Sequence, residues 1–347
     1  MPEYYLVSSW EEFKLLKNDW ISLADKINCW IYQDYQFLES IHKCINPYHK
    51  LTIAIVVYKE NNSIKGVLPL CVYRKKNIRI LAWMGSLNLM DHGEILFDNT
   101  CNITLDDFIT NAIQLIKKNI QYDVSYFGKI LANSPSYQYF NKNHHQIKTY
   151  KNGFIHLQNN FETYLEELKQ NRKNLKTDTL RQIKRISEKG SLEFEVIQKE
   201  NKNHVISVTD ELINQKKDIY KNTFWSNKEY RDIIVHQSLN LPHSHLSCLK
   251  LNQKIIAAHF GYIYKDTYTF FVPSYNSEFA TYSPGRLMIY FLIKYCYDNK
   301  IHYFDFGMGE ESYKFEWSNV ITNGASFIGN GIWGKMIRGY THLGGKL

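Results

Sequence analysis

The chain has 347 residues, 44% of them hydrophobic and 22% charged, and a formal net charge of +8. This composition is that of a globular protein with a sizeable core, and the length suggests two domains rather than a disordered chain. The six cysteines are widely spaced, no apolar run is long enough to cross a membrane, and the N-terminus shows no signal-peptide pattern. We therefore expect reduced thiols in a cytoplasmic protein, and neither a secreted disulfide scaffold nor an integral membrane protein.

The first half begins with a predicted helix over residues 10–23, where large apolar side chains recur at three- and four-residue steps. Residues 51–58 and 64–73 are apolar runs separated by a polar turn, which predicts a hairpin of two strands. Thr104 and Asp107 have the spacing of a capping box and open a predicted helix. The remaining predictions are a strand over 78–84, the end of that helix near 119, and a strand over 122–127.

The second half repeats this order of elements. When the numbering is shifted by 191, the hairpin at 51–73 aligns with a second hairpin that includes the segment 246–264, and Asn61 meets Asn252. A strand over 267–275, a helix from 283 to about 299 and a strand over 301–306 follow. A tandem duplication explains this shared order, and each helix between two strands predicts a parallel pair in an otherwise antiparallel sheet. We expect an α/β fold with domains at 1–150 and 151–347, the second ending in a glycine-rich tail, 321–347.

A basic segment joins the two halves. Residues 169–189 contain eight basic and two acidic side chains, a local net charge of +6. Such a run is commonly one solvated face of a helix. The alternative is a phosphate-binding surface, for which Arg172 and Arg181 are the candidates.

Two other patterns are weaker than they look. Residues 329–334 match G-x-G-x-x-G, but only 13 residues follow, so the acidic partner of a dinucleotide fold has no place. His243, His245 and Cys248 lie close together but lack a second pair of metal ligands. We interpret them as a pair of loop histidines and a core cysteine, and expect no metal.

The turn Ser283-Pro284-Gly285-Arg286 follows a strand and opens a long apolar helix. Serine suits the N-cap, proline suits the first turn, and glycine lets another group approach the backbone. The free N–H groups and the helix dipole favour an anion there, and Arg286 would add a charged contact. The alternative is a plain structural cap.

These motifs together resemble the GNAT acyltransferase superfamily. The resemblance rests on a strand ending in Phe271-Val272-Pro273, on Gly285-Arg286, on the strand at 303–306 and on Tyr313-Lys314-x-x-Trp317. In the first half, residues 66–70 and Met90-Asp91-His92 are similar to the same branch, that of the cellulose-biosynthesis acetyltransferases, close to the Fem-type tandem transferases. The resemblance covers nearly the whole chain and implies two tandem GNAT-like domains.

The resemblance also implies roles for individual residues. Ser283, Gly285 and Arg286 would hold the phosphates of acyl-CoA, and a backbone N–H near Phe271 or Val272 would polarise the thioester carbonyl. Tyr313 would protonate the departing thiolate, and Asp91 is our candidate for the base or orienting group, with Glu310 and Glu311 as the other carboxylates. The predicted acceptor contacts are His92, Arg172, Arg181, Lys314 and Trp317.

The sequence thus predicts an N-acyltransferase that moves an acyl group from acyl-CoA to a nucleotide-linked amino sugar, by direct attack of the amine. A thymidine-diphosphate amino-dideoxyhexose, made for a surface glycan such as lipopolysaccharide, is the first choice of acceptor, with no nucleic acid as partner. One alternative is a Fem-type aminoacyl-tRNA-dependent peptidoglycan transferase, although the long helical arm usual there is not visible. The other is a non-catalytic protein that binds nucleic acid through 169–189. The oligomeric state is left open.

Overall fold

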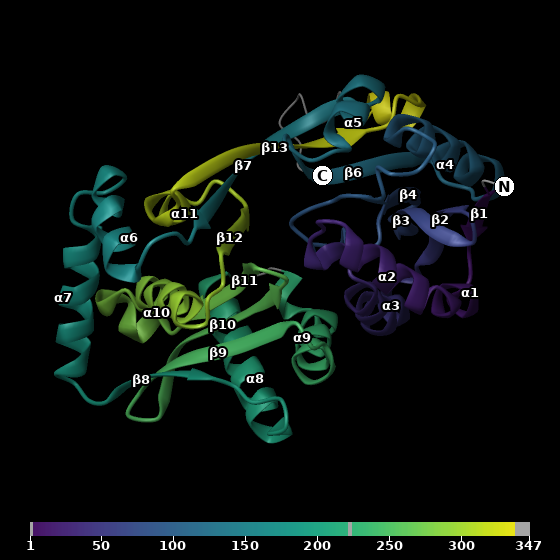
Figure 1. The fold of residues 1–347 in the computed structure, drawn as a ribbon. Coiled ribbons are helices and arrows are strands. Elements are labelled where there is room, and N and C mark those ends of the chain that lie inside the picture. Colours follow the sequence, from purple (N-terminus) through teal and green to yellow (C-terminus); the bar gives the residue numbers. More distant parts are fainter. Residues whose placement is uncertain (1–2, 221–223, 337–347) are drawn as a thin grey trace. The chain divides into compact units, whose positions relative to one another are not determined.

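The structure is a computed structural model that describes residues 3–220 and 224–336. The chain forms two compact units (Figure 1). The first unit contains the chain up to Lys151 together with the segment from Thr322 onward, and the second is Asn152–Ile321. The expected boundary at 150/151 lies next to the observed one, but the segment from Thr322 groups with the first unit instead of ending the second. Residues 337–347 of the predicted tail lie outside the described residues.

The first unit opens with a strand and a group of helices. Ser9 caps the first helix through a capping box with Glu12. The single helix predicted over residues 10–23 is two helices, because Leu16 ends one and begins the next. The elements are β1 (Glu3–Val7), α1 (Trp10–Leu15), α2 (Lys17–Lys26), the 3-10 helix η1 (Ile31–Gln33) and α3 (Tyr35–His49).

The sheet of the first unit has the strand order β1-β2-β3-β4-β6-β13, with β5 paired to β3. All its strand pairs are antiparallel except β4 and β6, which α4 connects. The elements are β2 (Thr52–Glu60), β3 (Ser63–Lys75), β4 (Ile78–Trp83), β5 (Leu96–Phe97), α4 (Leu105–Asn119), β6 (Val124–Leu131), α5 (Tyr137–Asn143) and β13 (Val320–Ile328).

The second unit has the strand order β7-β12-β11-β10-β9-β8. Its one parallel pair is β11 with β12, which α10 connects. Both α8 and α10 pack against β10 and β11. The elements are β7 (His145–His156), α6 (Phe161–Glu167), η2 (Leu168–Gln170), α7 (Leu175–Ser187), β8 (Leu192–Val196), α8 (Lys202–Ile219), η3 (Phe224–Ser226), α9 (Lys228–Asn240), β9 (Ser244–Leu251), β10 (Lys254–Tyr264), β11 (Thr267–Tyr275), η4 (Ser277–Tyr282), α10 (Pro284–Asp298), β12 (Tyr303–Met308) and α11 (Ser312–Trp317).

The predicted duplication of element order is confirmed: hairpin, strand, helix, strand in both halves, with the last two strands parallel. The two hairpin turns also match in backbone conformation. Asn61 and Asn62 have φ of 51° and 61°, and Asn252 and Gln253 have φ of 49° and 70°. Two successive left-handed residues form the tight turn whose twist suits a hairpin.

The two halves exchange their last strands. In sequence β7 follows β6 and α5 of the first half, but it pairs with β12 of the second unit. In the same way β13 follows β12 and α11, but it pairs with β6 of the first unit. Within residues 3–220 and 224–336, no helix is both long and apolar enough to span a bilayer.

Candidate functional site

The parallel strands β11 and β12 part from each other near their middle. They pair at Thr267–Tyr303, Tyr268–Phe304 and Thr269–Asp305, and this ladder then ends. Beyond it β11 stays on β10 as far as Tyr275, whereas β12 follows β7, with Met308 opposite Asn152. The buried carboxylate of Asp305 accepts hydrogen bonds of 2.9 Å from the Asn152 side chain and from the Gly307 N–H, which holds β12 on its new course. The two strands therefore form a V, within which a ligand can meet backbone polar groups.

Tyr313 on α11 lies at the apex of this V, where the two strands part. Its ring meets Phe270 and Phe306 edge-on, each with centroids 6.5 Å apart. These two residues directly follow the last parallel pair on β11 and on β12. The hydroxyl-bearing ring predicted to act on the leaving thiolate is thus held between the parting strands.

Phe271 sits in a bulge of β11. The register against β10 shifts between Phe260, which is opposite Val272, and Gly261, which is opposite Phe270, so Phe271 lies at the irregularity. Its N–H donates instead to Nε2 of His259 at 3.2 Å. This amide is therefore already engaged, and of the two predicted carbonyl-polarising positions Val272 is the better candidate.

A buried histidine–tyrosine–histidine network supports the bulge. Burial lowers the pKa of His259 well below its usual value, so the ring is neutral. Because Nε2 accepts from Phe271, Nδ1 carries the proton and donates to Tyr268 Oη at 3.0 Å; that oxygen is also 3.0 Å from Nδ1 of His245. His245 was predicted to lie in a loop but is a buried residue of β9, as is Cys248, and burial lowers the pKa of His245 to about 3.

The start of α10 is built as an open anion site. Ser283 has a left-handed backbone, with φ of 53°, and its side chain makes no capping bond, so the predicted serine cap is absent. A Cβ placed on Gly285 would meet only Tyr275, at 3.6 Å, so the protein itself leaves room there. The Arg286 guanidinium is half-buried and makes no hydrogen bond or ion pair with the described part of the chain. Burial, followed by the charge of Arg172, lowers the pKa of Arg286.

Arg172 and Arg181 lie near the start of α10, where their charges act on Arg286. Both are close enough to Arg286 for their charge to disfavour its protonated form. Arg172 Nη1 is 2.8 Å from Glu316 Oε2, and the two carboxylate oxygens of Asp178 bind Arg172 and Arg181 at 3.1 and 2.9 Å. The predicted acceptor arginines thus lie beside the predicted donor site.

Acidic neighbours also reduce the charge of the basic segment. Lys176 pairs with Glu162 and Glu166, and Lys169 pairs with Glu166. These glutamates lie outside residues 169–189, so the surface around the segment carries a smaller net positive charge than the +6 counted from the segment alone.

The other residues predicted on α11 differ in their surroundings. Glu310 is exposed. Glu311 occupies the N-cap position without a capping bond, and its carboxylate is 3.0 Å from Lys314 Nζ. Lys314 is only 6% exposed and also approaches the carbonyl oxygen of Gly307, at 3.4 Å. Trp317 is 1% exposed and the protein core encloses its indole; its contact with substrate stays a prediction.

Sequence reasoning missed Lys216 on α8. This side chain is 8% exposed and its Nζ lies 5.2 Å from the ring centres of Tyr220 and Trp225. Burial lowers its pKa to about 8, and the charges of Glu311 and Lys314 also act on it. The available signal was its position one turn after Leu212, on the apolar face of the helix.

Asp91 and His92 lie in the first unit and have structural partners there. The Asp91 carboxylate forms an ion pair with Lys129, whose Nζ also donates to the carbonyl of Met90 at 3.0 Å. The His92 ring is 1% exposed and lies 4.5 Å from the ring of Trp30. Both residues therefore fasten the loop after β4, and a role with the acceptor stays a prediction.

The corresponding V of the first unit is bridged by its own residues. Beyond the last pair of β4 and β6, Nε1 of Trp83 donates to the carbonyl of Gly128 at 3.1 Å. The first turn of α4 carries Asp106 and Asp107, where the second unit has Gly285 and Arg286. An acidic first turn repels an anion, so only the second unit carries a basic site at this helix start.

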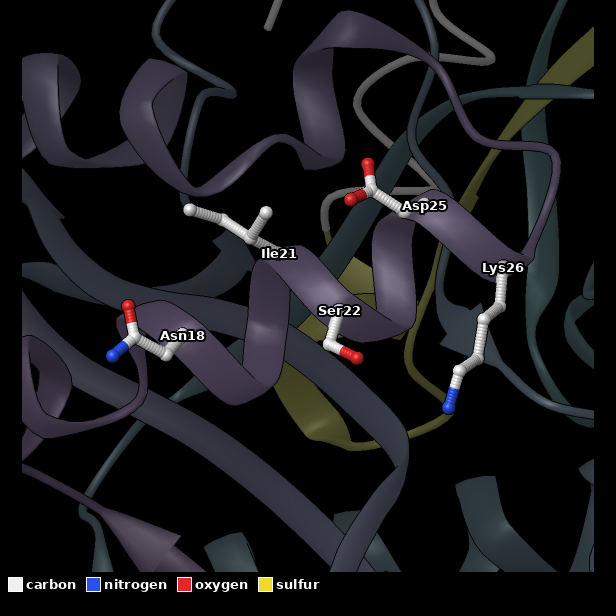
Figure 2. A pocket seen from close by; sticks show the side chains of 5 residues that line it. All are labelled: Asn18, Ile21, Ser22, Asp25 and Lys26. Carbon is white, nitrogen blue, oxygen red and sulfur yellow. The ribbon is translucent and has the colours of Figure 1, made fainter.

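A surface depression of about 400 Å³ lies on the first unit. Figure 2 shows that its five lining side chains all come from α2. None of them is a predicted site residue. They are Asn18, Ile21, Ser22, Asp25 and Lys26.

Residues 172–315 match the family described as "Acetyltransferase (GNAT) domain". Among solved structures, the chain is similar to FemX, with 11% identity, a TM-score of 0.65 and coverage of 94% of this chain and 96% of that one. It is also similar to the C-terminal domain of a putative lysylphosphatidylglycerol synthetase from Agrobacterium fabrum, with 9% identity, a TM-score of 0.59 and coverage of 95% and 97%. A tandem GNAT protein from the clavulanic acid biosynthesis pathway matches with 7% identity, a TM-score of 0.54 and coverage of 94% and 98%. No curated protein matches the sequence.

These comparisons confirm the predicted fold of two tandem GNAT-like domains. The protein is an acyl-transferring enzyme, and GNAT domains use acyl-CoA.

Proposed function

We propose that the second unit binds acyl-CoA and transfers its acyl group to the amine of a nucleotide-linked amino sugar. The observation that carries the donor assignment is the start of α10. Arg286 there is half-buried without an ion-pair partner in the described residues, beside a glycine with open space and two further arginines. A phosphate at this helix start would accept hydrogen bonds from the free backbone N–H groups. The helix dipole would stabilise its negative charge, and Arg286 would add a charge-assisted hydrogen bond.

The V between β11 and β12 suits the rest of the donor. A pantetheine chain is extended and carries amides, so it can bond to backbone groups that the parting strands leave available. The thioester would then lie near Val272 and Tyr313. Acyl-CoA supplies an activated carbonyl; the residues of this chain supply position, a hydrogen bond to the carbonyl oxygen and a proton for the thiolate.

The acceptor assignment follows from the GNAT-like resemblance of the sequence and from the basic segment 169–189, which together favour an acceptor that carries phosphates. The first choice is a thymidine-diphosphate amino-dideoxyhexose, acylated for a surface polysaccharide. The neutral amine would attack the thioester carbonyl carbon directly, the carbon–sulfur bond would break, and Tyr313 would donate to the sulfur. Lys314 is the predicted acceptor contact closest to the V, since it binds the carbonyl of Gly307 at the end of β12.

The extended likeness to FemX supports a second candidate, a Fem-type transfer from aminoacyl-tRNA to a peptidoglycan precursor. Both candidates need a phosphate-binding site and an amine acceptor, so the donor distinguishes them. Thiol release from acetyl-CoA and longer acyl-CoAs should be measured against a panel of nucleotide amino sugars. In parallel, transfer from aminoacyl-tRNA to a muramyl-pentapeptide nucleotide should be measured. Thiol release that requires an amino sugar supports the first candidate; transfer from aminoacyl-tRNA alone, with no thiol release, overturns it in favour of the second.

A further inference from the structure

We propose that Lys216 is the general base that takes a proton from the acceptor's ammonium group, an inference that rests on the proposed acyl transfer. Neither the family motifs nor the predicted carboxylates include this residue. Among those carboxylates, Asp91 is paired with Lys129 and Glu311 with Lys314. Lys216 is buried, and its Nζ has no hydrogen bond or ion pair with the part of the chain that the structure describes.

Lys216 lies on α8, which packs against β11 in the second unit. Its neighbour Gln215 accepts a hydrogen bond of 2.9 Å from Ser274 Oγ, on the part of β11 beyond the last parallel pair. On the other side, Lys216 interacts electrostatically with Glu311 and Lys314, which follow the end of β12. The lysine is therefore on a helix that contacts β11 beyond the parallel pairs and is within electrostatic range of α11, which follows β12; this brings it near the place where the thioester and the attacking amine would meet.

The surroundings of Lys216 favour its neutral form. Its Nζ lies 5.2 Å from the ring centres of Tyr220, which caps the end of α8, and of Trp225, on η3; these rings attract an ammonium ion but supply no full negative charge. Lys314 repels the charged form, and His259 on β10 is neutral. The carboxylate of Glu311 favours the charged form, but it is largely exposed and is shared with Lys314. Burial is the largest of these effects and lowers the pKa of Lys216 to about 8.

A base with that pKa suits this reaction. An acceptor amine arrives mainly as an ammonium ion and attacks only after losing a proton. Neutral Lys216 would accept one proton through the lone pair of Nζ. The freed nitrogen lone pair would form the new bond to the thioester carbon, and the carbon–sulfur electrons would leave with the thiolate. Tyr313 would give its proton to the thiolate sulfur, and the second proton lost by the nitrogen would return to the Tyr313 phenolate, so the products are an amide, a thiol and a protonated Lys216. A base is most effective when its pKa is near the working pH.

The test compares three variants in the thiol-release assay, with acetyl-CoA and the amino sugar that the unchanged protein uses. Lys216→Gln removes the base, and Lys216→Arg keeps the positive charge but cannot give up its proton. Lys217→Gln changes the adjacent, exposed lysine and is the matched control. We expect both Lys216 variants to lose about 100-fold or more in kcat while they stay folded at the assay temperature and keep the Kd for acetyl-CoA, and Lys217→Gln to match the unchanged protein.

The pH dependence supplies the second readout. Because the neutral amine is the active form, kcat of the unchanged protein should rise with pH and level off above about 8, the pKa of Lys216. Lys216→Gln should lack this step. Full activity in Lys216→Arg would show that only the charge matters, and an unchanged pH profile in Lys216→Gln would show that another group is the base; either overturns the proposal. If the unchanged protein binds no acyl-CoA and releases no thiol with any acceptor, the proposed function itself fails, and Lys216 loses its role with it.

Discussion

The ring of Tyr313 meets the ring of Phe270 edge-on, with centroids 6.5 Å apart, although 43 residues separate them in sequence. Phe270 is the first residue of β11 past its last parallel pair with β12. A short helix after β12 is thereby fixed to the neighbouring strand at the point where the two strands part. The hydroxyl of Tyr313 is positioned by packing on a rigid strand, which is what a group acting late in a transfer needs.

Tyr313→Phe keeps this packing and removes only the hydroxyl. A thiolate leaves tolerably without a proton donor, so we expect kcat to fall by at most about 100-fold with little change in the KM for the acceptor. Tyr303→Phe, on an exposed ring of β12, should leave kcat unchanged. Steady-state kinetics of both variants checks this, and unaltered kcat in Tyr313→Phe would remove Tyr313 from the mechanism.

Substitution of Gly285 should weaken the binding of CoA without lowering the stability of the fold. The added Cβ would be 3.6 Å from Tyr275, an ordinary contact, so Gly285→Ala and Gly285→Val should keep the Tm. The same atoms would stand where a pyrophosphate approaches the helix start. We expect the Kd for CoA, measured by calorimetry, to rise from glycine to alanine to valine. A flat series would place the pyrophosphate elsewhere.

Arg181 distinguishes a donor site from an acceptor site. Its exposed side chain has Asp178 as an ion-pair partner, and its charge reaches Arg286. A charge-assisted contact contributes about 1.5–3 kcal/mol, so Arg181→Ala should raise the KM for acyl-CoA about tenfold or more. Lys189→Ala removes the same charge from an exposed position of the same segment and serves as the control. An effect on the acceptor KM alone would instead support the acceptor contact predicted from the sequence.

Asp91 can be tested against its own partner. Asp91→Asn and Lys129→Met each break the ion pair that fastens the loop after β4, so both should lower the Tm. If Asp91 also orients the acceptor, only Asp91→Asn will raise the acceptor KM at a temperature where both variants are folded. Equal kinetics in the two variants would make the pair purely structural.

Lys216→Met should stabilise the protein while it lowers kcat. The pKa of Lys216 falls from 10.5 to about 8 on folding, so the unfolded chain binds this proton more tightly than the folded one. The resulting penalty is up to about 3 kcal/mol. It is fully present below pH 8 and fades as the pH rises toward 10.5. Thermal unfolding should show a Tm a few degrees above that of the unchanged protein at pH 7, and a difference that shrinks by pH 10. A lower Tm at pH 7 would mean that the charged form of Lys216 is stabilised by contacts.

The sequence was sufficient for those features that depend on near neighbours. Alternating and continuous apolar runs predicted the strands, and Asn61 and Asn252 marked the two hairpin turns because asparagine tolerates the left-handed conformation that such turns need. Thr104 predicted the start of α4, where its side chain accepts from the Asp107 N–H. The duplication followed from the order of these local elements.

Long-range packing decided the features that sequence reasoning missed. Arg172 and Arg286 are 114 residues apart, and only the folded structure, in which α7 packs near α10, shows that their charges act on each other. Asp91 looked like a free loop carboxylate because its partner Lys129 lies 38 residues further along the chain, on β6. Lys129 has a left-handed backbone conformation, which no local sequence pattern predicted. In the sequence Lys216 looks like any other helical lysine, and only the structure shows that its Nζ lies near the rings of Tyr220 and Trp225.

The exchange of strands determines when each sheet can finish folding during synthesis. β6 is made early, but its partner β13 lies some 200 residues downstream, near the end of the chain. During synthesis the first unit therefore leaves the ribosome with one edge of β6 unpaired, and it can close only after the second unit has emerged. Two consequences follow for anyone producing this protein: a fragment that stops near residue 151 should aggregate through that edge, and slow elongation should favour chaperone capture over early folding of the N-terminal half.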